Sequence, residues 1–97
     1  MASLKFHEDA TAEYLASLIW YAERNNATAI EFQNAVETAV RRIIAAPESF
    51  PSFDVGTRFV IVDRFPFSII YEQIKAAIQV VAVAHSSRRP GYWRYRR

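Results

Sequence analysis

The fold of this chain is decided by the stretch Ile78-Gln79-Val80-Val81-Ala82-Val83-Ala84, which is nearly all apolar and rich in β-branched residues. Side chains alternate between the two faces of a strand, so a strand that is apolar at almost every position is covered on both faces. The stretch therefore predicts an interior strand of a sheet. The rest of the 97-residue chain is placed around it.

Two further strands precede this one. Residues 58–62 and 67–74 are rich in β-branched and aromatic side chains. The intervals 63–66 and 75–77 are short enough for hairpin connections. The three strands therefore form an antiparallel meander.

Helical spacing dominates the first half of the chain. Residues 4–7 alternate apolar and polar, which predicts a short strand. Asp9 then follows as the expected cap of a first helix that runs to about Arg24, because its carboxylate can accept from free amides of the first turn. A short break at residues 25–27 ends this helix.

A second helix follows the break. Thr28 and Glu31 have the spacing of a capping box, in which each side chain satisfies the other residue's backbone amide. The helix ends near Ala46, because Pro47 disfavours helical geometry in the residue before it. Two helices joined by so short a break pack as an antiparallel hairpin.

The predicted order is β-α-α-β-β-β, and the fold class is α+β. The helical hairpin is the element available to cover an apolar face of the small, mainly antiparallel sheet. Between hairpin and meander, residues 47–54 form a loop that Phe50 and Phe53 pin to the body. Nothing in the pattern marks a domain boundary, so residues 1–97 are expected to form one domain. The position of the first strand in the sheet stays open.

Composition excludes several classes of function. The chain has no cysteine, which rules out disulfides, a thiolate nucleophile and cysteine metal sites. His7 and His85 are too few for a histidine-rich metal site, and Gly56 and Gly91 are too few for a phosphate-binding loop. No cofactor and no metal are expected. No signal peptide or membrane-spanning stretch is recognised either, so the expected location is the cytoplasm.

Charge is distributed unevenly. Residues 1–75 hold seven Lys/Arg and all ten Asp/Glu, a balance of −3, whereas residues 76–97 hold five Arg and no acid, a balance of +5. A cationic end suggests a polyanionic partner or an acidic protein surface. The alternative is an arginine-rich terminus that only keeps the protein in solution. The interleaved aromatic residues argue against that alternative.

The candidate functional residues follow the last strand. His85 closes it, on the face that period 2 assigns to Val81 and Val83, and is suited to proton transfer near neutral pH. The alternative role for His85 is to cap the strand end. Arg88 and Arg89 precede a Pro-Gly turn and suit phosphate or carboxylate.

Two aromatic residues follow the turn. Tyr92 and Trp93 can stack on bases, anchor a protein partner, or fold back to cover the sheet. His85, Arg89 and Tyr92 together would suffice for metal-free phosphodiester cleavage. In that scheme a base activates a ribose 2′-hydroxyl, arginine stabilises the charge, and tyrosine or histidine supplies the proton.

The chain resembles the RelE/ParE superfamily of toxins from bacterial type II toxin–antitoxin modules. The resemblance covers nearly the whole length and rests on the element order and on two blocks, Arg64-Phe65-Pro66-Phe67-Ser68-Ile69-Ile70-Tyr71 and Val81-Ala82-Val83-Ala84-His85 with Arg88-Arg89-Pro90-Gly91-Tyr92-Trp93. It implies a growth-arresting cytoplasmic protein that an antitoxin neutralises. DNA would be contacted only indirectly, through the antitoxin complex. RelE-like members cut mRNA on the ribosome, and ParE-like members poison DNA gyrase without being nucleases.

Departures from the pattern favour the ParE-like branch. The catalytic arginine of the mRNA-cleaving branch would fall at Ser68, and its other basic residues near Phe59 and Ile61. Serine cannot supply that positive charge. The expected function is poisoning of DNA gyrase, with ribosome-dependent mRNA cleavage by His85, Arg89 and Tyr92 as the alternative. A non-toxic remnant that only binds an antitoxin is the third possibility.

The resemblance also assigns binding residues. The expected target contacts are Arg64, Arg88, Arg89, Trp93 and Arg94. Trp20 and Tyr21 are expected to bind the antitoxin, and therefore to be partly exposed in the free protein.

Overall fold

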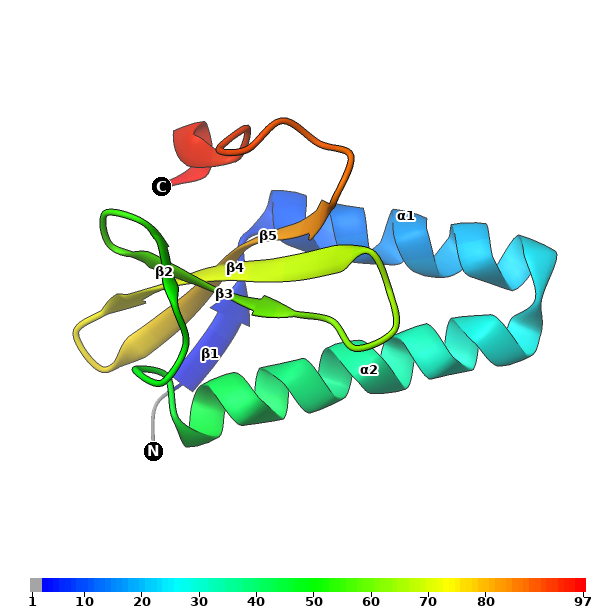
Figure 1. The fold of residues 1–97 in the computed structure, drawn as a ribbon, viewed down its shortest axis with the longest axis horizontal. Helices are drawn as coiled ribbons and strands as arrows, with labels where there is room; N and C mark the ends of the chain where they lie inside the picture. The colour runs from blue at the N-terminus through cyan, green and yellow to red at the C-terminus, as the bar shows by residue number, and fades with distance from the viewer. Residues whose placement is uncertain (1–2) are drawn as a thin grey trace.

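The computed structural model describes residues 3–97 (Figure 1). Its elements in chain order are β1 (Ser3–Phe6), α1 (Glu8–Arg24), α2 (Asn26–Ala45), β2 (Ser52–Asp54), β3 (Thr57–Ile61), β4 (Phe67–Ile74), β5 (Ala77–His85) and a short 3-10 helix, η1 (Arg94–Arg96). The predicted order is confirmed, with one extra strand, β2, inside the expected loop.

The five strands form one sheet in the order β1-β5-β4-β3-β2. Strands β2 to β5 pair antiparallel with their neighbours, and β1 pairs parallel with β5. Strand β5 is interior, as its apolar character predicts. The first strand, whose place the sequence left open, takes the edge beside β5.

The residues that begin each helix differ from the predicted ones. His7 caps α1 in place of Asp9, because its Nδ1 accepts from the Asp9 backbone amide at 3.0 Å. Asn25 caps α2 in place of Thr28, and its Oδ1 accepts from the Thr28 amide at 3.1 Å. The break between the helices is therefore a single residue. The hairpin itself is as predicted.

The helical hairpin covers one face of the sheet. Phe32, Val36 and Ile43 on α2 are buried against β3, β4 and β5, and Tyr14, Leu18 and Tyr21 on α1 close over them. Aromatic rings fill the end of this core, with Phe32 5.2 Å from Phe65 and 5.1 Å from Phe67 between ring centroids. This is the main core of the molecule.

The opposite face of the sheet is covered by the end of the chain. Figure 1 shows the red C-terminal stretch and α2 on opposite sides of the sheet. Trp93 packs there against Ile70, Val81 and Ala82 in a second, smaller core. Phe53 on β2 lies 5.6 Å from the Trp93 ring, so the loop around β2 is pinned to the body as expected, through a partner that the sequence did not indicate.

A bulge in β5 shifts the faces of its residues. Ile70 pairs with Ala82 but Tyr71 pairs with Val80, so Val81 is the extra residue. Val81 consequently lies in the second core while Val83 lies in the main core. The predicted common face of His85, Val81 and Val83 is therefore wrong for Val81. No helix within residues 3–97 is long and apolar enough to cross a membrane.

Candidate functional site

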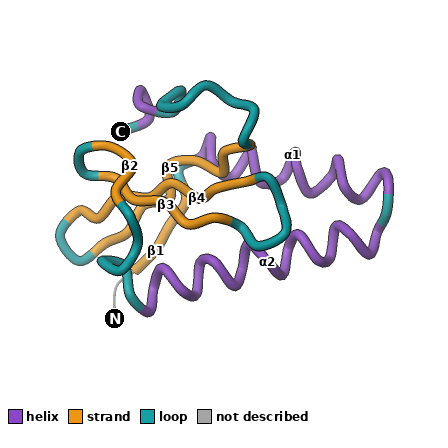
Figure 2. Tube along the Cα trace, in the orientation of Figure 1, coloured by secondary structure: helices purple, strands orange, loops and turns teal. Residues whose placement is uncertain are grey.

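Residues 86–97, the C-terminal segment, leave the end of β5 through a series of turns and lie over the sheet (Figure 2). Gly91 makes the turn possible, since its φ of 80° is in the region that favours glycine. Trp93 is only 1% exposed and anchors the segment. Of the roles open to it, the structure therefore supports covering the sheet, and in this conformation its indole has no surface for a target.

Glu13 on α1 binds the C-terminal segment through several hydrogen bonds. Its carboxylate accepts from the Tyr92 hydroxyl at 2.5 Å and from two Arg96 nitrogens at 2.9 and 3.0 Å. It also accepts from the Val83 backbone amide at 3.0 Å. Burial, and then the bond to Glu13, raise the pKa of Tyr92 well above its usual range. A tyrosine held in this way is a poor proton donor to a substrate.

Three of the five C-terminal arginines are paired within the molecule. Arg94 lies 2.6 Å from Asp54, Arg96 lies 2.9 Å from Glu13, and Arg97 lies 3.3 Å from Glu72. The hydrogen bond from Arg94 is the main reason that the pKa of Asp54 lies below its usual value. Much of the cationic character of this end therefore serves to hold the segment in place. Arg94 keeps 58% of its side chain exposed, so a target contact by Arg94 stays a prediction.

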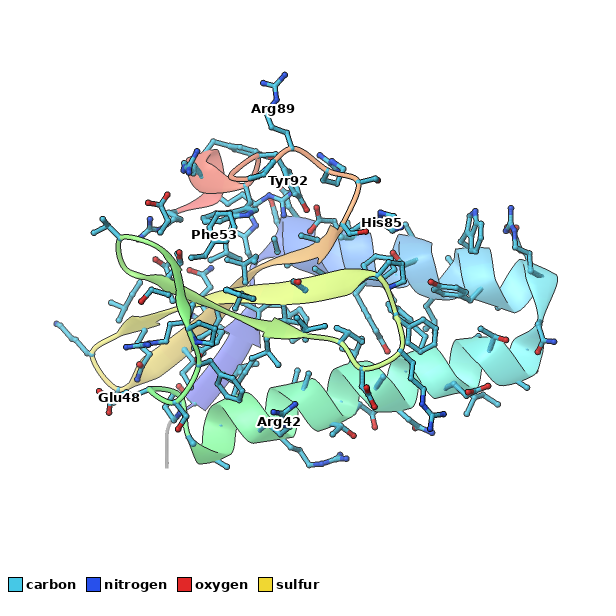
Figure 3. The ribbon with its side chains drawn as sticks, in the orientation of Figure 1. Arg42, Glu48, Phe53, His85, Arg89 and Tyr92 are labelled. Carbon is cyan, nitrogen blue, oxygen red and sulfur yellow. The ribbon has the colours of Figure 1, made fainter. Side chains whose placement is uncertain are left out.

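The remaining arginines of the expected target set are Arg64, Arg88 and Arg89. None of the three forms an ion pair among residues 3–97. The Arg88 guanidinium lies over the Tyr92 ring, 3.8 Å from its centroid. Arg89 projects away from the body into solvent (Figure 3). These unpaired cations are the ones available to an acidic partner.

His85 is held in one tautomer. Its Nδ1 accepts from the Ser87 backbone amide at 3.0 Å, so in the neutral ring the proton is on Nε2. The ring stands edge-on to Phe67, with 5.0 Å between centroids. His85 thus caps the strand end, which is the alternative role considered for it, and its Nε2–H is still free to donate a hydrogen bond.

A shallow hollow of about 200 Å³ lies on the face of the sheet opposite the helices. Its lining includes every residue proposed for phosphodiester cleavage, His85, Arg89 and Tyr92, together with Ser68 and Arg88. The structure therefore brings the set together. However, the Tyr92 hydroxyl is bonded to Glu13, and Ser68 puts a neutral side chain on the strand face.

A larger groove of about 610 Å³ lies between α1 and the end of the sheet. Trp20 and Tyr21 form its α1 wall, Pro66 and Phe67 form the opposite wall, and His85 lies between this groove and the hollow, lining both. Trp20 is 51% exposed and Tyr21 is half-buried, which agrees with the partial exposure predicted for both. The Arg24 guanidinium lies 3.6 Å from the Trp20 ring centroid.

Arg64 occupies a strained backbone position in the turn between β3 and β4. Its φ is 70°, and the Phe65 amide donates to the Val62 carbonyl at 3.2 Å. Glycine or asparagine is the usual residue at such a turn position. An exposed arginine held there is a candidate for function, because backbone strain tends to persist at functional sites.

Sequence reasoning missed the acidic side of this site. Asp54, Glu72 and Glu13 come from three different elements, and only the fold brings each of them to an arginine of the C-terminal segment. The available signal was indirect: a stretch with five arginines and no acid, if it folds onto the body, needs carboxylates from elsewhere. No cluster of three or more His, Cys, Asp or Glu side chains that could hold a metal ion occurs among residues 3–97.

Comparison with known proteins gives one family and one fold. A family model described as "ParE toxin of type II toxin-antitoxin system, parDE" matches residues 4–90. A solved structure described as "Chromosomal ParDE TA system from P. aeruginosa" superposes with a TM-score of 0.66, over 88% of this chain and 96% of that chain, at 24% sequence identity. A search of curated proteins finds no match. At that identity the superposition shows a shared fold, whereas the family model covers most of the chain.

Proposed function

We propose a function from one established premise: this chain belongs to the ParE toxin family of type II toxin–antitoxin systems. We infer that it is the toxin, which arrests growth when free and is held inactive by its cognate antitoxin. We further infer that it acts in the cytoplasm, without a cofactor, and meets DNA only through the antitoxin complex.

The target that we propose is DNA gyrase, with the protein acting by binding and not as a nuclease. The observation that carries this choice is the bond between Tyr92 and Glu13 at 2.5 Å. It engages the hydroxyl of Tyr92, one of the two candidate proton donors, and the raised pKa of Tyr92 makes proton donation unfavourable. Ser68 supplies no positive charge for a transition state. Arg64, Arg88, Arg89 and the exposed part of Arg94 are then the proposed gyrase contacts.

Ribosome-dependent mRNA cleavage is the second candidate. The observation in its favour is that His85, Arg89 and Tyr92 line one hollow, with Arg88 beside them. In this case His85 would supply the proton, or the ribosome would draw the Tyr92 hydroxyl away from Glu13. A non-toxic remnant that binds only an antitoxin is the third candidate.

Induced expression of the protein in bacteria tests the three candidates together. DNA breaks that depend on gyrase, with intact mRNA, are the expected result. Codon-phased cuts in mRNA that disappear in His85→Ala and Arg89→Ala would favour cleavage and overturn the gyrase proposal. Normal growth in the presence of folded protein would favour the third candidate, a non-toxic remnant that binds only an antitoxin. The protein encoded by the neighbouring short reading frame is then co-expressed. If this removes the growth defect, the result supports the pairing with an antitoxin.

A further inference from the structure

Arg88 and Arg89 are neighbours in the chain and are both exposed, yet only the Arg88 guanidinium rests on an aromatic ring. It lies 3.8 Å from the centroid of the Tyr92 ring, whereas Arg89 projects into solvent (Figure 3). Neither arginine forms an ion pair among residues 3–97. A cation over the face of an aromatic ring is attracted by the negative charge of that face. The two arginines therefore differ in how firmly the free protein holds them.

The turn after β5 brings the Tyr92 ring back to Arg88. The Tyr92 amide donates to the Arg89 carbonyl at 3.2 Å, and Gly91 in this turn has a φ of 80°. Tyr92 itself is half-buried and packs against the second core around Trp93. Its ring is therefore a fixed surface on which an exposed guanidinium can rest.

Glu13 orients this ring through the Tyr92 hydroxyl. The hydroxyl donates to the Glu13 carboxylate at 2.5 Å. Glu13 is in turn held by an Arg96 nitrogen at 2.9 Å and by the Val83 amide at 3.0 Å. Donation to a carboxylate makes the phenol oxygen and its ring more negative, which strengthens the attraction of the ring for a cation. Glu13, on α1, thus acts on Arg88 through Tyr92.

An arginine that is already held in the free protein binds a partner at a lower entropic cost. Arginine has a long side chain with many rotamers, and fixing such a side chain at an interface opposes binding. Arg88 has given up part of this freedom before it meets a partner, because its guanidinium rests on the Tyr92 ring. Its unpaired charge remains available to a carboxylate.

We propose that Tyr92 is a positioning residue for target binding. Its ring holds the Arg88 guanidinium where that group meets a carboxylate of gyrase, and Glu13 orients the ring. The inference rests on the proposed function, because it takes gyrase as the target. It adds that two residues assigned no contact with the target, Tyr92 and Glu13, contribute to the affinity.

A pair of double-mutant cycles tests this role, with affinity for purified DNA gyrase as the measurement. Tyr92→Leu removes the ring, and we expect it to weaken binding about 3- to 30-fold, the range of a cation–π interaction. In an Arg88→Ala background the same change should cost less than about 2-fold, because the ring then has no guanidinium to hold. In the matched Arg89→Ala background it should cost as much as in the wild type. Equal losses in all three backgrounds would assign Tyr92 a structural role only and overturn the proposal.

Two further variants separate the ring from the hydroxyl and from the general loss of an aromatic residue. Tyr92→Phe keeps the ring without its bond to Glu13, so its affinity should fall between those of the wild type and Tyr92→Leu. Tyr95→Leu removes a tyrosine of the same segment that is 74% exposed, and it should change the affinity less than about 2-fold. Circular dichroism verifies that each variant is folded. Binding by Tyr92→Phe as weak as that by Tyr92→Leu would contradict the role of the ring.

The position of Arg88 can also be measured in the wild type, which keeps the proposal testable if Tyr92→Leu fails to fold. A guanidinium over a ring face is shielded by the ring current. The Nε proton of Arg88 should therefore resonate upfield of the Nε proton of Arg89 in the NMR spectrum, and Arg88→Lys and Arg89→Lys assign the two signals. Coincident signals would show that the ring does not hold Arg88, and would overturn the proposal.

The outcomes distinguish this inference from the proposed function. If the wild type binds gyrase but the ring contributes equally with and without Arg88, the positioning role is wrong and the gyrase proposal stands. If the wild type does not bind gyrase, the proposed target is wrong, and the positioning role fails with it.

Discussion

Glu13 and Arg96, which are 83 residues apart in the chain, together close the edge of β5 that β1 leaves open. Pairing of β1 with β5 ends at Phe6 and Val80, and the His7 amide still reaches the Val80 carbonyl at 2.8 Å. Beyond that point an Arg96 nitrogen donates to the Val81 carbonyl at 3.1 Å, and Glu13 accepts from the Val83 amide. The side chains of this ion pair therefore bond to an amide and a carbonyl of β5 that a neighbouring strand would otherwise satisfy. With these two groups occupied, the edge offers fewer free backbone groups for another chain to pair with.

Replacing Glu13 tests the importance of this closure. Glu13→Ala leaves the Tyr92 hydroxyl and the Val83 amide without partners and leaves Arg96, whose side chain is only 5% exposed, with the more distant carboxylate of Asp9 at 3.6 Å. The Glu13 side chain that is removed is itself only 16% exposed. Breaking one side of a buried pair costs about 3–5 kcal/mol, so we expect a loss of about 3 kcal/mol in the free energy of unfolding, measured with urea.

The matched control is Glu23→Ala on the same helix. Glu23 keeps 69% of its side chain exposed and lies 4.0 Å from Arg24. Surface pairs of this kind contribute at most about 1 kcal/mol, so the control should be close to wild type. Equal stability of Glu13→Ala and Glu23→Ala would contradict the role given to the ion pair.

The layout of the sheet and hairpin could be predicted because it depends on the spacing of apolar residues within each short segment. The apolar stretch of β5 requires two covered faces, and the structure puts β5 between β1 and β4. The helix starts were misplaced because several side chains near each start can accept from an amide, and His7 and Asn25 precede the predicted caps. Strand β2, with three residues, is too short to show a period.

The site was harder to predict than the fold. Its histidine and arginines could be named from their place after the last strand, but nothing local says which arginines are already paired. The bulge at Val81 has no distinct sequence signal, and it changes which face each residue of β5 occupies. Nothing in the sequence around Glu13 distinguishes it from a solvent-facing residue of a helix, because its partners lie at the other end of the chain.

Burial of Tyr92 should make the protein sensitive to alkaline pH. Its pKa is raised in the folded state by burial and by Glu13, while in the unfolded chain a tyrosine ionises at about pH 10. The contribution to stability is complete below about pH 10 and is lost as pH rises above it, because the unfolded state then releases the proton first. Urea unfolding at about pH 8 and about pH 10.5 measures the decrease.

Tyr92→Phe isolates the contribution of this hydroxyl. The variant should lose about 1–3 kcal/mol near neutral pH, since Glu13 loses one charged hydrogen bond. Its stability should then fall less steeply with pH than that of the wild type. Parallel decreases in the two proteins would show that Tyr92 is not responsible. Tyr14, Tyr21 and Tyr71, whose pKa values burial also raises, remain in both and cancel in the comparison.

Trp93→Ala tests whether the second core holds the C-terminal segment. Removal of a fully buried aromatic side chain costs about 3–5 kcal/mol, and Trp93 is 1% exposed. We expect a loss of that size in the free energy of unfolding, and faster trypsin cleavage at the arginines of the segment. Trp20→Ala is the control, because Trp20 is half exposed and its removal should leave both quantities nearly unchanged. Unchanged cleavage in Trp93→Ala would mean that the ion pairs alone hold the segment.

Arg64 and Lys75 allow function to be separated from strain, because both are exposed and hold positive φ, 70° and 59°, in the two turns of the meander. Positive φ destabilises a non-glycine residue by about 1–2 kcal/mol. Glycine avoids this strain but loses about 0.5–1 kcal/mol, because its unfolded chain has more conformational freedom. Arg64→Gly and Lys75→Gly should therefore each gain up to about 1 kcal/mol in stability.

If Arg64 contacts the target, Arg64→Gly should be less toxic than wild type although it is more stable, whereas Lys75→Gly should keep full toxicity. The measurements are urea unfolding and the growth rate after induction at equal protein level. A more stable Arg64→Gly with undiminished toxicity would remove Arg64 from the target contacts.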